Sequence, residues 1–434
     1  MSQTTNRHFL TSTFASLQWF VFIFANTIVV PISIGAAFAL DSQMIAELIR
    51  NSLAITGIAC VLQGVVGHRF PLLEGHSGLM WGLVLNLCYS ADAVGMSLVE
   101  IGGGIATGML ISGAIVAVLA ALNGLRFMQK IFTPMVMSVF LFLLTFQLVM
   151  IFFEGMFKRT ADGLIEWPET LLALAVAAFV SMLKIIGSEK LGNFSILIGI
   201  VVGWVLHMML FPAGESVPAS ASVMSITLFP LGVPNLNIPI IVVTCIATLI
   251  NLSNSITAVT TAAQLFGEDA PQSRLNRSYL LNGLYSMAGG VLGLVTHAPF
   301  ASTIGFLQST RILDRRPFLI GGMLMVGTGL LPMMSGVLAT MPVTIGNAVL
   351  LVAYFQLLGT SLSSIRGWVF NSITIHRIAL PVLVGLGVLS IDPAYFQDIP
   401  ALVQPLLSNG FIVGVLLSIV LELLVPWDRK NSGL

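Results

Sequence analysis

Apolar runs long enough to cross a lipid bilayer recur from one end of this chain to the other. A membrane-crossing helix needs about 20 predominantly apolar residues. Of the 434 residues, 56% are hydrophobic and only 8% are charged, whereas roughly 25% of the residues of a soluble globular protein are charged. The chain is therefore predicted to be an all-α polytopic membrane protein rather than a water-soluble domain.

Counting these runs, including those broken by glycine, proline or polar residues, predicts fourteen spans. The ranges in the first half are 14–40, 44–67, 70–88, 98–122, 131–153, 168–186 and 194–212. The ranges in the second half are 238–266, 278–297, 298–311, 317–341, 343–362, 374–391 and 404–426. Seven spans is an odd number, so two homologous halves would face opposite sides of the membrane, as in the inverted repeats of many secondary transporters.

Lys and Arg are enriched in the cytoplasmic loops of membrane proteins and so indicate the orientation. With a cytoplasmic N-terminus, one side of the membrane holds only Arg50, Lys158 and Arg159. The cytoplasmic side then holds Arg7, Arg69, Arg126, Lys130, Lys184, Lys190, Arg274, Arg277, Arg311, Arg315, Arg316, Arg366, Arg377, Arg429 and Lys430. This pattern supports the count of fourteen and predicts a cytoplasmic (inner) membrane protein with both termini in the cytoplasm.

The third span of each half is broken in the same way. The sequence RFPLLEGHSGLMWG opens the first of these spans, and HAPFASTIGFLQ opens the second. A helix that begins inside the membrane leaves up to four backbone N–H groups without partners and presents a positive dipole end. The two breaks predict a shared binding site for a solute rich in acceptor atoms. A planar amide-like solute and an anion both fit this description.

Several small or polar side chains inside the spans are candidates for contact with that solute. Asn251 and Ser255 lie four residues apart and share one face of the eighth span. Asn26 lies among aromatic residues in the first span, and Tyr354 lies in the twelfth. Polar side chains inside a membrane mark substrate pathways, but they also hold helices together. Both interpretations stay open for these four residues.

Glu74 is an acidic residue inside the membrane part of the chain, just before the first break and two residues from His76. A carboxyl group in that place is a candidate to carry a coupling proton, and His76 is its neighbour in sequence. The alternative is a structural carboxylate that accepts hydrogen bonds from the broken span.

Motifs for other chemistries are missing from the sequence. It has no GxxxxGKS/T loop for ATP and no HExxH or CxxC pattern for a metal. Three widely spaced cysteines suit neither a disulfide framework nor a zinc site. A formal net charge of zero gives no reason to expect a nucleic-acid partner. We therefore expect a carrier without cofactor or metal, and not an enzyme.

Four segments carry a resemblance to a known family. They are LQWF at 17–20, EGHSGLMWG at 74–82, NLSN at 251–254 and PLLSNG at 405–410. Over essentially its whole length the chain resembles the nucleobase–ascorbate transporters, or nucleobase:cation symporter-2 family, which includes uracil and xanthine permeases. Within this family it is most similar to a bacterial branch of purine permeases.

The resemblance implies an architecture of fourteen spans in a 7+7 inverted repeat, usually in a homodimer. Spans 1–4 and 8–11 form a core domain that holds the substrate, here 14–122 and 238–341. Spans 5–7 and 12–14 form a gate domain, here 131–212 and 343–426. Short antiparallel strands from spans 3 and 10 flank the site, and they match the extended pieces expected at 70–74 and 297–301.

The resemblance also assigns site residues one at a time. A glutamate of the eighth span, which binds the base and takes part in proton coupling, falls on Asn251, and a histidine one turn later falls on Ser255. The glutamate or glutamine that leads the tenth-span motif falls on Ser302, and its asparagine falls on Thr303. A tyrosine of the twelfth span matches Tyr354.

Both carboxylates of the family site are therefore replaced in this chain, and a histidine of the first span is replaced by Trp19. An asparagine offers a donor and an acceptor to a base edge, but it cannot take up a proton near neutral pH. Two alternatives follow. Either Glu74 carries the coupling proton in this chain, or the protein is a facilitator.

The sequence thus predicts a nucleobase permease that works by alternating access and carries a purine, such as xanthine or hypoxanthine, or uracil. A ureide or an anion is the alternative substrate. Asn251 and Ser302 are expected at the base edge and Tyr354 at the gate. The backbone N–H donors are expected near Ser77, Gly78 and Ala301.

Overall fold

A computed structural model describes most of the chain, namely residues 2–89, 91, 95–124, 133–158, 160, 163–211, 226–268, 272–300, 303–338, 340–396, 398–400 and 403–427. Seven residues named above lie outside this part: Arg126, Lys130, Arg159, Ala301, Ser302, Arg429 and Lys430. The protein is predominantly helical, with one small sheet.

The described elements of the first half run from the N-terminus to residue 210. They are α1 (Ser2–Ala25), α2 (Val29–Ala37), α3 (Ser42–Val65), β1 (Glu74–His76), α4 (Gly78–Tyr89), α5 (Leu98–Ala121), α7 (Pro134–Gly155), α8 (Trp167–Ile185) and α9 (Glu189–Leu210).

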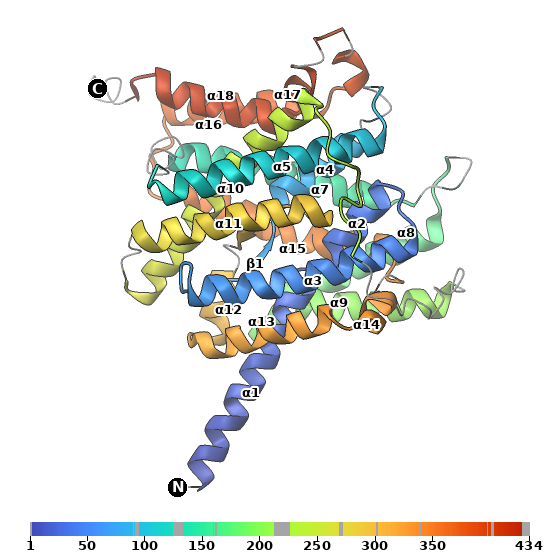
Figure 1. The fold of residues 1–434 in the computed structure, drawn as a ribbon, viewed down its shortest axis with the longest axis vertical. Helices are drawn as coiled ribbons and strands as arrows, with labels where there is room; N and C mark the ends of the chain where they lie inside the picture. The colour runs from blue at the N-terminus through green and yellow to red at the C-terminus, as the bar shows by residue number, and fades with distance from the viewer. Residues whose placement is uncertain are drawn as a thin grey trace.

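The elements of the second half begin at residue 238. They are α10 (Ile238–Phe266), α11 (Gln272–Leu292), β2 (His297–Pro299), α12 (Thr303–Thr310), α13 (Arg315–Gly329), α14 (Pro332–Leu338), α15 (Val343–Ser364), α16 (Ser372–Leu389), η1 (Pro393–Phe396), α17 (Gln404–Leu407) and α18 (Gly410–Leu424). Figure 1 shows α1 projecting from the bundle that the other helices form.

Seven of the described helical segments are long and apolar enough to cross a membrane, so this is a multi-pass membrane protein. Four shorter apolar helices accompany them: Gly78–Tyr89, Phe194–Leu210, Val343–Phe355 and Gly410–Leu424. Each of the fourteen predicted ranges overlaps at least one helix. The number of times that the chain crosses the bilayer stays a prediction.

Capping residues explain where several of these helices begin or end. Asp41 accepts a hydrogen bond from the Met44 amide at the start of α3, and Asn237 accepts one from the Ile240 amide at the start of α10. These caps satisfy backbone donors that have no partner inside the helix. The long helix α10 ends at Gly267, whose φ of 64° is the left-handed conformation that favours glycine.

The first predicted span, 14–40, consists of two helices joined by a turn at residues 26–28. Pro31 lacks the N–H group that would bond to the Thr27 carbonyl. In addition, the Asn26 side chain donates to the Phe22 carbonyl, and the Thr27 hydroxyl donates to the Ile23 carbonyl. These bonds compete with the regular backbone ladder, so the helix is interrupted near the middle of the span.

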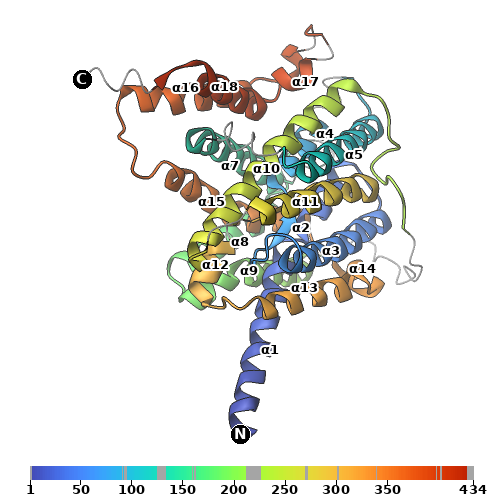
Figure 2. The same cartoon turned by 60° about the vertical axis from the view of Figure 1, so that its left-hand side comes forward.

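The helices pack in pairs that recur between the two halves of the chain. In one group α3 packs against α13 and α5 packs against α11 and α10, while α1 also packs against α13. In another group α7 packs against α15, α8 packs against α9, and α16 packs against α18. Figure 2 shows α16 and α18 side by side at one edge of the molecule. An inverted repeat requires that each contact has a counterpart when the two halves are exchanged. The α3–α13 contact corresponds to α11–α5, α1–α13 corresponds to α10–α5, and α8–α9 corresponds to α16–α18.

Glycines let the helices of the α5–α11 pair approach closely. A Cβ atom placed on Gly113 would lie 2.6 Å from the Gly283 carbonyl oxygen, and one placed on Gly283 would lie 2.6 Å from the Gly113 carbonyl oxygen. Small residues at such crossings are typical of membrane helices, because apolar lipid gives no hydrophobic drive for association and close packing replaces it.

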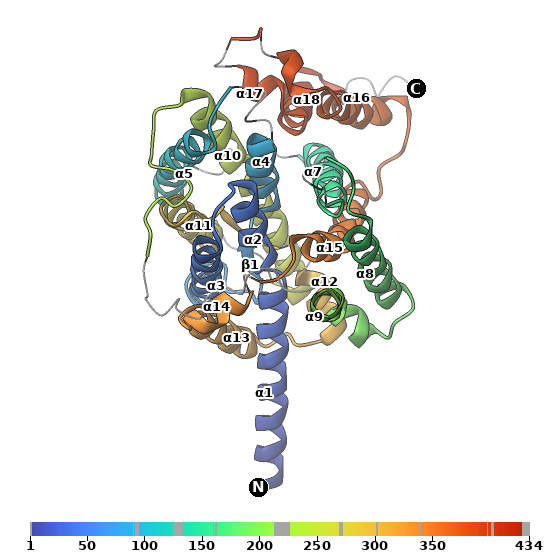
Figure 3. The same cartoon turned by 90° about the vertical axis from the view of Figure 1, so that its right-hand side faces the viewer.

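The two strands pair in the middle of the molecule. β1 and β2 are antiparallel, with Glu74 opposite Pro299, Gly75 opposite Ala298 and His76 opposite His297. Figure 3 shows β1 between two sets of helices, with α3, α5, α11 and α13 on one side and α7, α8 and α15 on the other. This two-stranded ribbon joins segments from the two halves of the chain, and each strand leads into a short helix, α4 or α12.

Candidate functional site

The ribbon extends beyond its paired residues and fixes where α4 begins. The Ser77 amide donates to the Thr296 carbonyl (2.7 Å), and the Phe300 amide donates to the Leu73 carbonyl (2.8 Å). The Leu73 amide donates to the Thr303 hydroxyl (3.3 Å), so the first residue of α12 is bonded to the segment that precedes β1. The starts of both short helices are thus held by hydrogen bonds across the ribbon.

Asn251 and Ser77 meet at the start of α4, although they are 174 positions apart in sequence. The Ser77 hydroxyl donates to Asn251 Oδ1 at 2.6 Å, and Asn254 Nδ2 donates to the same oxygen at 3.0 Å. Both Ser77 and Asn251 are buried, with exposures of 1% and 2%. The Asn251 oxygen therefore already has two donors, while no hydrogen-bond partner for its Nδ2 exists among the described residues.

The α4 start offers backbone donors, but not all those expected. Ser77 Oγ accepts from the Met80 amide (3.3 Å), and the Ser77 amide itself donates to Thr296. The Ser77 N–H itself is therefore not free for a ligand. In the described part of the chain, nothing accepts from the amides of Gly78 and Leu79. Gly78 is half-buried, whereas Leu79 is buried.

Tyr354 lies against this helix start, as the sequence predicts for a residue on the gate side. A Cβ atom on Gly78 would lie 3.3 Å from Tyr354 Cε1 and 3.4 Å from its hydroxyl oxygen. The tyrosine ring also packs near Phe152 and Trp81, at centroid distances of 5.3 and 6.1 Å. An aromatic wall thus covers the start of α4 from the side of α7 and α15. Across the ribbon, the half-buried ring of Phe300 lies close to Gly75.

Two other candidate residues, Ser255 and Asn26, form hydrogen bonds with residues other than Ser77. Ser255 Oγ accepts from Asn282 Nδ2 of α11 at 2.7 Å, and Asn282 in turn accepts from Gln63 of α3 at 2.7 Å. Ser255 therefore holds three helices together, which is the structural alternative for a polar residue in a membrane helix. Asn26 donates to the Phe22 carbonyl at the interruption of the first span.

Glu74 is paired with His68 and not with His76, its neighbour in sequence. Glu74 Oε1 lies 3.0 Å from His68 Nε2, and both side chains are fully buried. His68 Nδ1 accepts from the Phe70 amide, which leaves the proton of a neutral imidazole on Nε2, where it donates to the carboxylate. Glu74 Oε2 has no partner among the described residues.

His76 and Glu74 nevertheless share one face of β1, because residues two apart in a strand point the same way. His76 Nε2 bonds to the Ser52 hydroxyl of α3 at 2.8 Å. The facing residue of β2 is His297, whose Nε2 bonds to the Thr56 hydroxyl at 3.1 Å. Sequence reasoning missed His68 and His297. One signal could have found them: three of the six histidines, His68, His76 and His297, lie at the two breaks.

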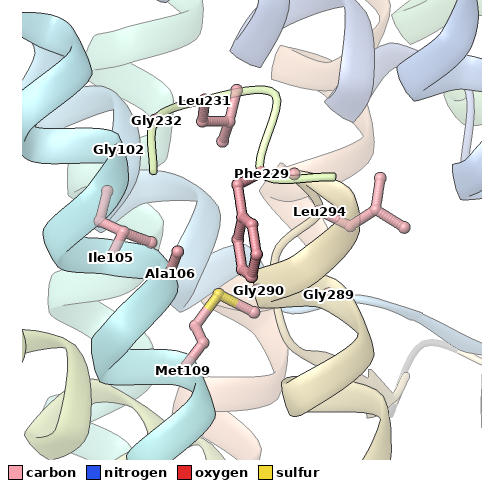
Figure 4. A pocket seen from close by; sticks show the side chains of 11 residues that line it. Gly102, Ile105, Ala106, Met109, Phe229, Leu231, Gly232, Gly289, Gly290 and Leu294 are labelled. Atoms are coloured by element: carbon pink, nitrogen blue, oxygen red, sulfur yellow. The ribbon is translucent and has the colours of Figure 1, made fainter. Parts of the chain in front are cut away.

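The described residues contain no group of three or more His, Cys, Asp or Glu that could hold a metal ion. The cavity drawn in Figure 4 lies away from Ser77 and Asn251, between α5, α11 and the segment 229–232. It measures about 10 Å³, which is close to the space that one water molecule needs. Glycines and apolar side chains line it, so it does not enlarge the candidate site.

Comparisons of sequence identify relatives among membrane permeases. A family described as a permease family matches residues 10–393. The chain is 26% identical over 428 residues to the "Putative purine permease YwdJ" of Bacillus subtilis (strain 168), covering 96% of each chain. It is 25% identical over 429 residues to the uric acid transporter UacT of Escherichia coli (strain K12), covering 96% of this chain and 86% of the other. It is also 25% identical to the xanthine permease XanP of E. coli (strain K12) over 436 residues, 96% of this chain and 92% of the other.

Solved structures with the same fold are more distant in sequence. The transmembrane domain of a cyanobacterial bicarbonate transporter, BicA, gives a TM-score of 0.61 at 13% identity, covering 94% of this chain and 97% of that one. The murine anion transporter Slc26a9 in its inward-facing state gives a TM-score of 0.63 at 14% identity, covering 95% and 68%. Such low identity shows the fold alone. The sequence matches show that the chain belongs to the nucleobase–ascorbate transporter family of membrane permeases.

Proposed function

We propose that this permease carries a nucleobase, with a purine base such as xanthine or hypoxanthine as its first substrate. One observation carries the proposal. Ser77 and Asn251 meet at the start of α4, under the ring of Tyr354 and beside two backbone N–H groups that have no partner among the described residues. The relatives are named as purine, uric acid and xanthine carriers, which favours a purine over uracil.

The chemistry of a base matches these groups. The amides of Gly78 and Leu79 would donate to a carbonyl oxygen of the base, helped by the positive end of the helix dipole. Asn251 Nδ2 would donate to an acceptor on the base edge. The rings of Tyr354 and Phe300 are planar and apolar, as flanking groups for a flat base should be. We also propose that Ser302 and Ala301 contact the base, because they directly precede α12 in the sequence. Asn26 is proposed for the same role, because it lies at the break of the first span.

We further propose that transport proceeds by alternating access between the core domain (14–122 and 238–341) and the gate domain (131–212 and 343–426). Gly78 belongs to the first and Tyr354 to the second, and the two residues touch. A relative movement of the two domains would open or close that contact. The proposal includes a homodimer in the cytoplasmic membrane, with both termini in the cytoplasm.

A proton is the proposed co-substrate. Because the family's eighth-span carboxylate is Asn251 here, the proposal assigns the coupling role to Glu74. Glu74 is the acidic residue of the ribbon, and His68 holds one of its oxygens at 3.0 Å. A facilitator without coupling is the alternative.

An anion carrier of the same fold is the alternative substrate class, suggested by the likeness to bicarbonate and anion transporters. An anion site would favour a cationic side chain near the half-helix starts. In the described part of the chain, no Lys or Arg bonds to Ser77 or Asn251. This favours an uncharged base, and it also leaves a neutral ureide as a competitor for the same site.

The test is uptake in cells that lack their own base carriers. The panel consists of radiolabelled uracil, xanthine, hypoxanthine, guanine, adenine, urate and allantoin, together with bicarbonate, with and without a protonophore. We expect uptake of one or more purines and none of bicarbonate. Uptake of bicarbonate or allantoin with no base would replace the proposed substrate. Transport of none of these solutes would remove the proposal.

A further inference from the structure

Two histidines from opposite halves of the chain face each other inside the core of the protein. His76 of β1 and His297 of β2 form a directly opposed cross-strand pair. Their ring centroids are 4.7 Å apart and their planes are inclined by 44°. Both side chains are buried, with exposures of 1% and 0%. The pair thus places two titratable rings in contact where water has no direct access.

Each ring has one partner on the same helix. Ser52 and Thr56 lie one turn apart on α3, and each bonds to the Nε2 atom of one histidine. A hydroxyl group donates to a neutral nitrogen or accepts from a protonated one by rotating its hydrogen. Each of these two hydrogen bonds can therefore persist, with its direction reversed, when its ring gains or loses a proton.

The second nitrogen of each ring lacks a normal partner. His76 Nδ1 is buried without a hydrogen bond among the described residues. His297 Nδ1 is likewise buried without a hydrogen bond among the described residues. Buried polar atoms without partners are rare, and in native proteins they indicate a water molecule, an ion or a functional group. Two such atoms on adjacent rings therefore indicate a bound species.

The groups around the pair favour one positive charge over two. Glu74 lies on the same face of the ribbon, and its Oε2 is also buried without a described partner. His68 donates to the other oxygen of Glu74. From α11, Tyr285 places its ring 6.3 Å from His297, with a buried hydroxyl that has no described partner. A carboxylate can balance a single added proton, whereas two charged rings in contact would repel each other.

The remaining ionisable groups of α3 lie at either end of this cluster. Cys60 has its sulfur near the backbone of Glu74, where it accepts from the Glu74 amide at 3.4 Å. Glu47 accepts from the backbone and hydroxyl of Thr227 near the start of the helix, and Arg50 lies beside it. Among these groups, only Glu74 is an acid that shares the strand face of the two histidines.

We propose that the His76–His297 pair binds one proton, taken up from one side of the membrane and released to the other, and that this proton drives base transport. The proposal rests on the proposed function, because the next residue after His76 is Ser77, which holds Asn251. A proton on the pair would alter the ribbon from which α4 begins, and so would act on the base site.

The transport test compares His297→Gln and His76→Gln with His376→Gln, a control at an exposed histidine of α16. We expect both ribbon variants to lose protonophore-sensitive accumulation while retaining exchange of labelled for unlabelled base. The control should behave as the parent protein. Accumulation by His297→Gln with an unchanged pH dependence would overturn the inference and leave the permease assignment intact. Equilibration without accumulation by the parent protein would also overturn it.

A direct measurement decides the matter if the variants do not fold or if no base is carried. The full-length protein, labelled with ¹⁵N in its six histidines, is reconstituted in lipid and titrated between about pH 5 and pH 8 by NMR. We expect two imidazoles to titrate together and to take up one proton between them, with Ser52→Ala shifting their signals. A pair that stays neutral throughout, or two rings that titrate independently, would overturn the proton site whatever the substrate proves to be.

Discussion

Asn251 carries an amide rather than a carboxylate, which limits what its side chain can do chemically. Its oxygen accepts from Ser77 and Asn254, so the side chain is held in one orientation. A glutamate could exchange a proton with the substrate, whereas an amide can only donate and accept hydrogen bonds. At the residue scale, base recognition and proton uptake are thus assigned to different groups: Asn251 on α10, and the acid and imidazoles of the ribbon.

Glu74→Gln separates these two roles. Glutamine keeps the shape of the side chain and an oxygen that accepts from His68, but it carries no charge and takes up no proton. We expect exchange of base to persist and accumulation driven by a pH gradient to be lost, as measured by uptake at two external pH values. Gradient-driven accumulation by the variant equal to that of the parent would refute a role for Glu74 in coupling.

Individual site residues were predictable from the sequence to different degrees. Asn251, Ser77, Gly78 and Tyr354 were predicted as neighbours, and the structure brings them together at the start of α4. His297 was not, because its contacts depend on the register of a ribbon that pairs residues more than 200 positions apart. His68 was not predicted either, although its partner Glu74 is only six positions away. Ser255 shares a helix face with Asn251, but a polar partner on α11 takes its hydroxyl. Spacing along one helix cannot reveal such a partner.

At the element scale, the contact between α4 and α15 limits how closely the two proposed domains approach. Gly78→Ala adds a methyl group 3.3 Å from the Tyr354 ring and from Leu148, tighter than ordinary van der Waals contact. We expect the variant to bind base but to exchange it more slowly, since the closed state is strained. Tyr354→Phe, which keeps the ring, is the control. An unchanged exchange rate in Gly78→Ala would mean that the two helices do not close on each other.

The glycine crossing of α5 and α11 gives a second prediction at this scale. Gly113→Ala would bring a methyl group within 2.6 Å of the Gly283 carbonyl, and such overpacking costs about 1–3 kcal/mol. We expect a lower midpoint of thermal unfolding in detergent. Gly327→Ala on α13, where nothing lies within 4 Å of the added atom, should leave it unchanged. Equal midpoints for the two variants would contradict the packing described.

Helix positions followed from the apolar runs, but interruptions within the runs were harder to predict. The predicted range 317–341 consists of α13 and α14, which meet where Pro332 begins the second helix. The range 404–426 consists of α17 and α18, with Asn409 capping α18. Hydropathy averages over about 20 residues, so it detects a span without showing a one-residue break inside it.

At the scale of the whole molecule, the helices form two sets with the ribbon between them (Figure 3). Pairs such as α3–α13 and α5–α11 recur between the halves, which supports the proposed inverted repeat. The two histidines and the two short helices come from equivalent places in the two halves. The proposed site thus lies where the halves meet, as in other carriers built from inverted repeats.

The orientation of the chain can be tested by labelling. Single cysteines are introduced at Gly163, in the α7–α8 loop, and at Asp314, before α13, in a background in which Cys60, Cys88 and Cys245 are replaced. We expect a membrane-impermeant maleimide to label the first from outside intact cells and the second only after the membrane is opened. The reverse labelling pattern would invert the proposed topology. Labelling of both positions from outside would change the number of spans between them.

Equilibrium binding to the purified protein tests the central claim most directly. Radiolabelled xanthine, hypoxanthine and urate are titrated against the parent protein, Asn251→Ala and, as a control, Thr328→Ala at an exposed position of α13. One hydrogen bond contributes about 0.5–1.5 kcal/mol, so loss of Asn251 should weaken binding by up to about tenfold. The account predicts that the parent and the control bind a purine equally and that Asn251→Ala binds it more weakly. Equal binding by Asn251→Ala and the parent, or no binding of any of the three bases, would contradict it.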